Sequence, residues 1–365
     1  MQKSIQERTK ASLLLSNGLK FEGFSFGYDH FAEGEVVFDT AMVGYPESLT
    51  DPSFAGQILC ITYPLIGNYG VPEDQIIEGI SQFYESDKIH VKGLIITEYS
   101  YDYSHWSALK SLDQWLKEHK IVGIYAVDTR EITKVLRDQG SMVGKIITEN
   151  HTEASDDDNC GEKNLVKSVS CSEPIIYNKG GEKRVLLLDC GVKHTILRAL
   201  ANKNIEIVRV PYDYKFNNSD LGECDGLLIS NGPGNCSDCE TTIDEIKKFM
   251  ESEKPILGIG MGNLLLAKAA GAEVIKLKCG HRGPNQPVRM VGTERCFITS
   301  QCHGYSVDAK TLPSDWKESF INLNDNSNEG IQHLTKPFTG VQFHPEGVSG
   351  PIDTKFIFDN FIEKL

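Results

Sequence analysis

Residues 255–270 read Pro-Ile-Leu-Gly-Ile-Gly-Met-Gly-Asn-Leu-Leu-Leu-Ala-Lys-Ala-Ala. The first apolar run is typical of a parallel strand buried on both faces, and the run that begins at Asn263 predicts a helix. The glycines between them favour a sharp strand-to-helix turn, a nucleophile elbow, which lifts its middle residue above the sheet at a helix N-terminus. That middle residue is Gly260, which has no side chain. For this segment alone, a tight turn or an anion site is the simpler interpretation.

Strands and helices alternate along the chain before this turn. Apolar strand patterns occur at residues 184–189, 205–210 and 226–230, and helices are expected over about 193–203 and 240–252. Such alternation predicts right-handed crossovers and a parallel sheet with a helix layer on each face. Ligands bind at the carboxyl ends of the strands in sheets of this kind, so we expect the chemistry there.

The first part of the chain has another pattern. Residues 11–19 predict strand, turn and strand, and residues 35–39 predict a further strand. Amphipathic helices are expected over 107–119 and over 129–139, the second with Thr129 as its N-cap. This mixture indicates an α+β domain.

A polar, acidic stretch separates the two patterns. Residues 149–183 contain few apolar side chains in their first half and favour a surface linker. A chain of 365 residues is long enough for two domains. We therefore predict domains over 1–148 and 184–365, joined by a linker over 149–183.

Composition excludes several classes of function. The net charge of −14 argues against a nucleic-acid partner, and no apolar run is long enough to span a membrane. The start of the chain lacks the pattern of a secretory signal, so the ten cysteines are expected to be thiols in a reducing compartment such as the cytoplasm. Cys236 and Cys239 form a single C-x-x-C with no second pair, and we predict no metal site.

Two more segments fall at predicted strand ends. Gly232 and Gly234, in the loop Ser-Asn-Gly-Pro-Gly over 230–234, can direct backbone N–H groups at a developing oxyanion. His344 and Glu346 stand two residues apart in Gln-Phe-His-Pro-Glu, so an extended backbone points them the same way, as an imidazole base and its orienting carboxylate require. Each segment alone is more simply a tight loop or an ordinary turn.

Together with the elbow, these segments resemble the class I (triad) glutamine amidotransferase domain. The first domain resembles the carbamoyl-phosphate synthase small subunit in the segments 43–53, 61–70 and 127–133, and the match continues at 188–193, 281–287 and 328–331. The resemblance implies an α/β protein. A mixed α+β small-subunit domain would precede a flavodoxin-like, parallel-sheet amidotransferase domain.

The resemblance also implies site residues. Gly260 stands where the family has its catalytic cysteine, followed by His344 and Glu346 of the triad. The positions implied for substrate binding are Ser53, Gly232, Gly234, Met261, Leu264, Cys302, Gly304 and Tyr305. Four of the family's pocket residues are replaced, by Gly260, Asn263, Leu264 and Cys302. Without a thiolate no covalent intermediate forms, and His344 has nothing to activate.

The leading interpretation is a pseudo-glutaminase that serves as a structural or regulatory partner of an ammonia-using synthetase subunit. The chain itself would hold no cofactor, ATP and magnesium would bind to the large synthetase subunit, and glutamine would bind only if the pocket still accepts it. Asn263 and residues 350–354 resemble the ammonia-dependent branch, which makes the mitochondrion the alternative compartment.

Two other functions stay open at this point. An active glutaminase could use Cys302 or Cys236 as a surrogate nucleophile to supply ammonia for carbamoyl phosphate synthesis in the pyrimidine or arginine pathways. A glutamine-sensing domain would bind without cleaving, although Leu264 and Cys302 remove two side-chain partners of the ligand and so weigh against it.

Overall fold

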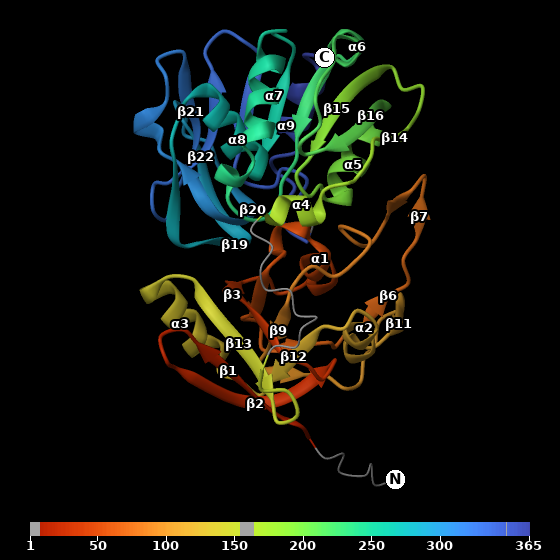
Figure 1. Ribbon diagram of the computed structural model, residues 1–365, viewed down its shortest axis with the longest axis vertical. Helices are drawn as coiled ribbons and strands as arrows, with labels where there is room; N and C mark the ends of the chain where they lie inside the picture. Colours follow the sequence, from red (N-terminus) through yellow and green to blue (C-terminus); the bar gives the residue numbers. More distant parts are fainter. Residues whose placement is uncertain (1–7, 154–163, 348) are drawn as a thin grey trace. The chain divides into compact units, whose positions relative to one another are not determined.

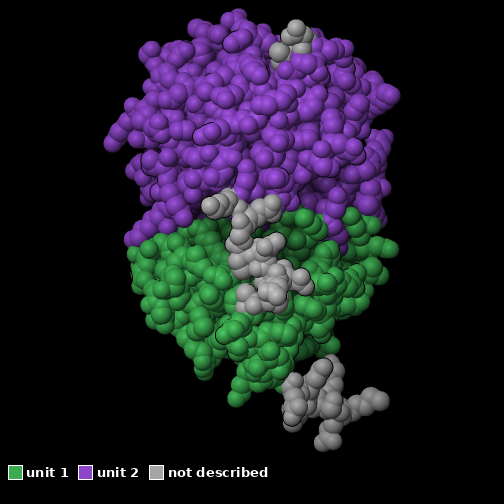
Figure 2. Space-filling view, in the orientation of Figure 1, with its two compact units in different colours: residues 1–50, 56–74, 88–162 green, residues 51–55, 75–87, 163–365 purple. Residues whose placement is uncertain are grey.

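The computed structural model describes residues 8–153, 164–347 and 349–365. The chain divides into two compact units (Figure 2). Unit 1 consists of residues 1–50, 56–74 and 88–162, and unit 2 consists of residues 51–55, 75–87 and 163–365. Two short segments from the first half of the chain therefore belong to unit 2, which a single boundary near residue 148 does not anticipate.

Unit 1 is built on a closed barrel with the strand order β1-β13-β3-β4-β9-β12-β2. The buried side chains of the barrel strands form one core. In β1 they alternate with more exposed residues, as expected of a strand that is buried on one face. The barrel strands are β1 (Lys10–Leu15), β2 (Lys20–Gly27), β3 (Ala32–Asp39), β4 (Gln57–Ile61), β9 (Gly93–Ile95), β12 (Val122–Tyr125) and β13 (Met142–Thr148). The remaining elements are α1 (Tyr45–Thr50), β5 (Leu65–Ile66), β6 (Val71–Pro72), β10 (Glu98–Tyr99), β11 (Ala108–Lys110), α2 (Leu112–Glu118) and α3 (Thr129–Gln139).

The predicted helices of unit 1 need two corrections. The helix expected over 107–119 begins only at Leu112, because β11 precedes it and the side chain of Ser111 caps it by accepting from the N–H of Gln114. The helix over 129–139 is confirmed, but its N-cap is Asp128, whose carboxylate accepts from the N–H of Glu131.

Unit 2 contains a ten-stranded sheet with the order β14-β16-β15-β17-β18-β23-β22-β21-β19-β20. The strands from β16 to β23 in this order run parallel, and the other pairs are antiparallel. The sheet strands are β14 (Ile175–Tyr177), β15 (Lys183–Asp189), β16 (Ile205–Pro211), β17 (Gly226–Ile229), β18 (Ile256–Ile259), β19 (Val274–Met290), β20 (Cys296–Val307), β21 (Trp316–Asn322), β22 (Asn328–His333) and β23 (Phe338–Val341). The small hairpin β7 (Ile76–Ile77) and β8 (Ile80–Ser81) also belongs to this unit.

Helices cover both faces of the parallel strands (Figure 1). Alternate residues of β15 enter two different cores: Leu186 and Leu188 pack with residues of α7 and α8, whereas Val185 and Leu187 pack with residues of α5 and α9. This confirms the predicted parallel sheet between two helix layers. The helices of unit 2 are η1 (Pro52–Phe54), α4 (Leu165–Val169), α5 (His194–Ala201), α6 (Asn218–Glu223), η2 (Cys236–Asp238), α7 (Glu240–Met250), α8 (Met261–Ala270), η3 (Ala309–Thr311) and α9 (Phe356–Ile362).

The predicted linker over 149–183 is wrong in its second half. Residues 154–163, which carry half of the acidic side chains of this stretch, lie outside the described residues. Further along, α4 and β14 are folded, and Val166 and Tyr177 are buried in the two cores of unit 2. One buried side chain from each element is sufficient, because it enters a core that other segments provide.

No helix among the described residues is long and apolar enough to cross a membrane.

Candidate active site

Gly260 forms the turn between β18 and α8, with φ 57° and ψ −109°. Residues other than glycine rarely adopt this backbone conformation, which is the strained one expected of a nucleophile elbow. A Cβ added at Gly260 would lie 3.5 Å from the Cβ of Asn231, an ordinary van der Waals contact, so a Cβ fits at this position without a clash. The flanking glycines are different: a Cβ at Gly258 would lie 2.5 Å from the carbonyl oxygen of Gly262, and one at Gly262 would overlap the carbonyl oxygen of Ile229. The elbow geometry predicted from the sequence is therefore present, without a nucleophile.

The loop over 230–234 lies beside the elbow. A Cβ at Gly232 would overlap the carbonyl oxygen of Cys190, so only glycine fits there, and Gly234 has φ +82°. Between Ser230 and Gly232, the side chain of Asn231 donates to Ser53 Oγ at 2.8 Å and accepts from the N–H of Lys193 at 3.2 Å. Ser53, a substrate position implied by the resemblance, is thus brought to this loop within unit 2.

His344 and Glu346 meet as their spacing predicted. Nδ1 of His344 lies 2.9 Å from Oε1 of Glu346, and both side chains are buried. The backbone N–H of His344 donates to the carbonyl oxygen of Ser300 at 2.8 Å, which fixes the pair against β20, the strand that also carries Cys302.

A buried ammonium group, which the sequence analysis did not identify, completes this arrangement. Lys193 Nζ lies 3.1 Å from Glu346 Oε1 and 3.8 Å from Asp51 Oδ2. Burial alone would raise the pKa of Glu346, but the charge of Lys193 and the contact with His344 lower it to about 2. Burial opposes the charged form of Lys193 as well, yet Glu346 and Asp51 together raise its pKa above the usual range. The carboxylate that orients His344 is therefore held ionised.

Sequence reasoning missed Lys193 and Asp51 although both stand in segments that carry the resemblance. Lys193 is the N-cap of α5, just beyond the end of β15, and Asp51 caps η1. The position at a strand end was the available signal for Lys193. No local pattern could show that Asp51, in the first half of the chain, folds into unit 2.

The remaining predicted positions lie either on helix α8 or on strand β20. Met261 and Leu264 lie in the first turns of α8 and are buried in the core that contains α7 and α8. Asn263 donates to Gln342 Oε1 at 2.8 Å, within a buried pair. Cys302, Gly304 and Tyr305 lie on β20.

The proposed surrogate thiols have different surroundings. Cys236 is fully buried, and burial raises its pKa to about 11, which disfavours a thiolate. Cys302 is half-buried and is not in a disulfide. Cys239, the partner of Cys236 in the C-x-x-C, is buried in the same core.

In the comparison with known proteins, two family models match successive parts of the chain. Residues 13–146 match the family model of the carbamoyl-phosphate synthase small chain, CPSase domain, and residues 186–364 match that of glutamine amidotransferase class-I. The chain is 44% identical to the carbamoyl phosphate synthase arginine-specific small chain of Saccharomyces cerevisiae, over 98% of this chain and 89% of that protein.

Longer relatives match as well. The chain is 48% identical to the multifunctional protein CAD of Squalus acanthias, over 97% of this chain and 16% of the relative. It is 45% identical to carbamoyl-phosphate synthase (ammonia), mitochondrial, of Homo sapiens, over 99% of this chain and 24% of the relative. The chain thus spans a quarter or less of these two proteins. With both family models matched in order and nearly the whole yeast small chain covered, the chain belongs to the carbamoyl-phosphate synthase small chain family.

Proposed function

We propose that this chain is a pseudo-glutaminase, which acts as a structural or regulatory partner of an ammonia-using synthetase subunit. The observation that carries the proposal is the elbow: its backbone has φ 57°, a Cβ would fit there without a clash, and residue 260 has no side chain. A site prepared for a nucleophile therefore lacks the atom that would attack the glutamine amide.

The chemistry follows from that missing atom. A triad without its nucleophile keeps only what its oxyanion donors and binding contacts supply, roughly 10³-fold over water. His344 has no thiol to deprotonate, so the buried chain of contacts from His344 through Glu346 to Lys193 serves to hold the loop and strands together.

An active glutaminase with a surrogate thiol is the alternative, and the environment of Cys236 weighs against it. A fully buried thiol with its pKa raised to about 11 is a poor nucleophile at neutral pH. Cys302 is more accessible but lies on β20 rather than at the elbow, where the helix N-terminus and the glycine loop are aimed.

The partner is proposed from the relatives. The human relative is named as an ammonia enzyme, and both it and the multifunctional CAD protein extend far beyond the part that this chain matches. We propose that a large synthetase subunit supplies the ATP and magnesium sites, while this chain holds no catalytic cofactor of its own. The cytoplasm, with the mitochondrion as alternative, stays a prediction.

Ammonia release from glutamine by the purified chain tests the proposal, measured with and without a synthetase subunit. The wild type and Gly260→Ala are expected to release ammonia at no more than about 10³ times the rate of a buffer control, far below the rate of an active enzyme. Gly260→Cys reveals whether the rest of the pocket still works, and a variant that adds Leu264→Gln and Cys302→Asn restores two more of the family's residues.

Release by the wild type at a rate typical of enzymes, abolished by Cys302→Ser or Cys236→Ser, would overturn the proposal. Activity in the triple variant but not in Gly260→Cys would show that glutamine binding was lost along with the nucleophile.

A further inference from the structure

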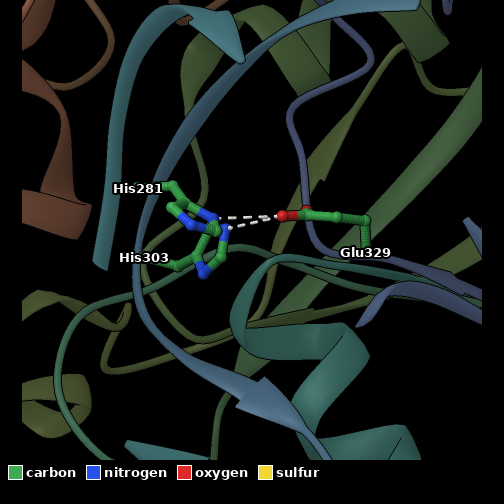
Figure 3. Close-up of side chains that lie close together, drawn as sticks. All are labelled: His281, His303 and Glu329. Atoms are coloured by element: carbon green, nitrogen blue, oxygen red, sulfur yellow. Dashed lines mark hydrogen bonds and ion pairs between the residues drawn. The ribbon is translucent and has the colours of Figure 1, made fainter. Parts of the chain in front are cut away.

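Three antiparallel strands of unit 2 bring two imidazole rings and a carboxylate together. His281 on β19 stands opposite His303 on β20 in the strand register, and Glu329 comes from β22. Figure 3 shows both rings turned toward one carboxylate oxygen. Oε1 of Glu329 lies 3.1 Å from Nδ1 of His281 and 3.6 Å from Nε2 of His303. None of these side chains takes part in the candidate active site, so their arrangement needs its own explanation.

The neighbours of His303 provide no hydrogen-bond donor for the lone pair of its Nε2 atom. Nδ1 lies 2.9 Å from the backbone carbonyl oxygen of Tyr305, which can only accept, so Nδ1 carries the hydrogen. Nε2 of the neutral ring then presents a lone pair, yet it faces Gln301 Oε1 at 3.0 Å and Glu329 Oε1 at 3.6 Å. The amide of Gln301 is oriented by its own donation to Thr299 Oγ1. A positive species is needed between these atoms.

A second proton on the ring or a cation bound to the lone pair would satisfy this geometry.

Glu329 gives an independent indication. Its side chain is fully buried, and among the residues that the structure describes its Oε2 atom has no hydrogen-bond partner. Leaving one oxygen of a buried carboxylate unpaired is costly, and a cation held against the carboxylate, through Oε1 or through both oxygens, would offset part of that cost.

The two separations that involve Glu329 agree with one small divalent ion, and the two imidazole nitrogens would close around it. The candidate ligand atoms of the three residues lie within 4.8 Å of one another. Zinc binds histidine nitrogen and carboxylate oxygen at about 2.0–2.2 Å, which separates neighbouring ligands of a tetrahedral site by about 3.4 Å. The observed separations of 3.1 Å and 3.6 Å fall on either side of that value.

The outer contacts of both rings are also those of metal ligands. Nε2 of His281 lies 2.9 Å from Asp325 Oδ2, and Nδ1 of His303 lies 2.9 Å from the Tyr305 carbonyl oxygen. In metal sites the ring nitrogen that does not bind the ion almost always donates to a carboxylate or a backbone carbonyl. Each histidine therefore already has the partner that would direct its other nitrogen at an ion.

We propose that His281 Nδ1, His303 Nε2 and Glu329 bind one divalent cation of the zinc class. The amide of Asn322, whose Nδ2 lies 3.0 Å from Glu329 Oε1 and 3.3 Å from His281 Nδ1, contacts two of the proposed ligand atoms in the metal-free cluster and must move aside when the ion binds.

The site would fasten the segment of β20 on which Cys302, Gly304 and Tyr305 stand, since His303 lies among them. It is independent of the pseudo-glutaminase proposal, because cation binding does not require a nucleophile at Gly260.

Metal stoichiometry of the full chain tests the proposal. The protein is stripped with a chelator, its accessible thiols are alkylated, and it is dialysed against Zn²⁺ or Co²⁺. One equivalent per chain is expected, and the visible spectrum of bound Co²⁺ should be that of a tetrahedral site with nitrogen and oxygen ligands. Glu329→Gln should bind at least tenfold more weakly.

Two further variants keep the test decisive. Asp325→Asn removes only the outer carboxylate of His281, from a half-exposed residue, and should weaken binding about tenfold while the fold is kept. His333→Asn is the matched control, because His333 is a buried histidine of β22 with a carboxylate partner, Asp315 at 3.2 Å, outside the cluster. It should bind as the wild type does. No binding by the wild type, undiminished binding by Glu329→Gln and Asp325→Asn, or thiolate bands in the Co²⁺ spectrum would each overturn the site.

Discussion

At the scale of single residues, the glycines around the elbow differ in what a side chain would meet. A Cβ at Gly260 meets only ordinary contacts but would stand on a backbone with φ +57°, whereas one at Gly232 would overlap a carbonyl oxygen. Gly222, on α6, has no positive φ, and a Cβ there would meet no atom within 4 Å. The three positions therefore separate backbone strain from steric exclusion.

We expect Gly260→Ala to lower the free energy of unfolding by about 1–3 kcal/mol, because the new side chain must adopt a strained conformation. Gly232→Ala should lower it further or prevent folding, and Gly222→Ala should be neutral or stabilise by up to about 1 kcal/mol. Urea unfolding measures all three. Equal stability of Gly260→Ala and the wild type would show that the turn carries no strain.

Glu346 gives the stability of the protein a pH dependence. Its pKa is lowered from 4.5 to about 2 in the folded chain, against the effect of burial, by Lys193 and His344. A group whose pKa is depressed by folding contributes stability above its unfolded pKa and loses it as the pH falls toward the folded pKa. This contribution should be complete at neutral pH and disappear between about pH 5 and pH 2.

Glu346→Gln should therefore lower the free energy of unfolding at pH 7 on the order of 3 kcal/mol, and the difference from the wild type should shrink as the pH falls. Chemical unfolding at pH 7, 5 and 3 measures this difference. Glu131→Gln, on the exposed surface of α3, is the control and should differ little at any pH. A Glu346→Gln deficit that stays constant from pH 7 to pH 3 would contradict the assigned pKa.

At the scale of elements, sequence patterns predicted those that carry a strong period or a continuous apolar run. The alternating β1, the amphipathic α3 and the four central parallel strands of unit 2 were all expected. The start of α2 was misplaced, because the apolar spacing of Leu109 and Leu112 continues through a strand and a cap. α4 and β14 were missed because short elements contribute only one or two side chains to a core, too few to form a period.

The site was predictable where its residues are close in sequence. His344 and Glu346 were identified from a spacing of two, and the elbow from three glycines. Lys193, Asp51 and Glu329 could not be placed, because tertiary packing alone brings them to their partners.

Val166 tests whether α4 is part of the core. It is 1% exposed and packs in the cluster that contains α7 and α8. We expect Val166→Ala to lower the free energy of unfolding by about 1–3 kcal/mol, the range for a truncated core side chain. Lys167→Ala, at the next position and exposed, should change it by less than about 0.5 kcal/mol. Equal effects of the two substitutions would restore the linker interpretation for this segment.

At the scale of the whole molecule, the stability of unit 2 depends on two segments from the first half of the sequence. Residues 51–55 and 75–87 belong to it, and they provide carboxylates to one buried and one partly buried cation of this unit. Asp51 lies 3.8 Å from Lys193, and Glu85, which is 1% exposed, lies 3.2 Å from Arg198. A domain cut at the apparent boundary would leave both cations without these partners.

A fragment of residues 163–365 should therefore be much less stable than the same unit within the full chain. Breaking a buried ion pair by removing one partner typically costs about 3–5 kcal/mol. For a unit of this size, a loss of one kcal/mol of stability lowers the midpoint of thermal unfolding by about 2–4 °C. We therefore expect the Tm of the fragment to fall by on the order of 10–20 °C. Calorimetry of the fragment beside the full chain measures this shift. Glu85→Gln in the full chain isolates one of the two pairs and should produce an intermediate decrease. If the fragment unfolds cooperatively at the temperature of the full chain, the segments 51–55 and 75–87 add nothing to the stability of unit 2, and the buried cations are compensated from within it.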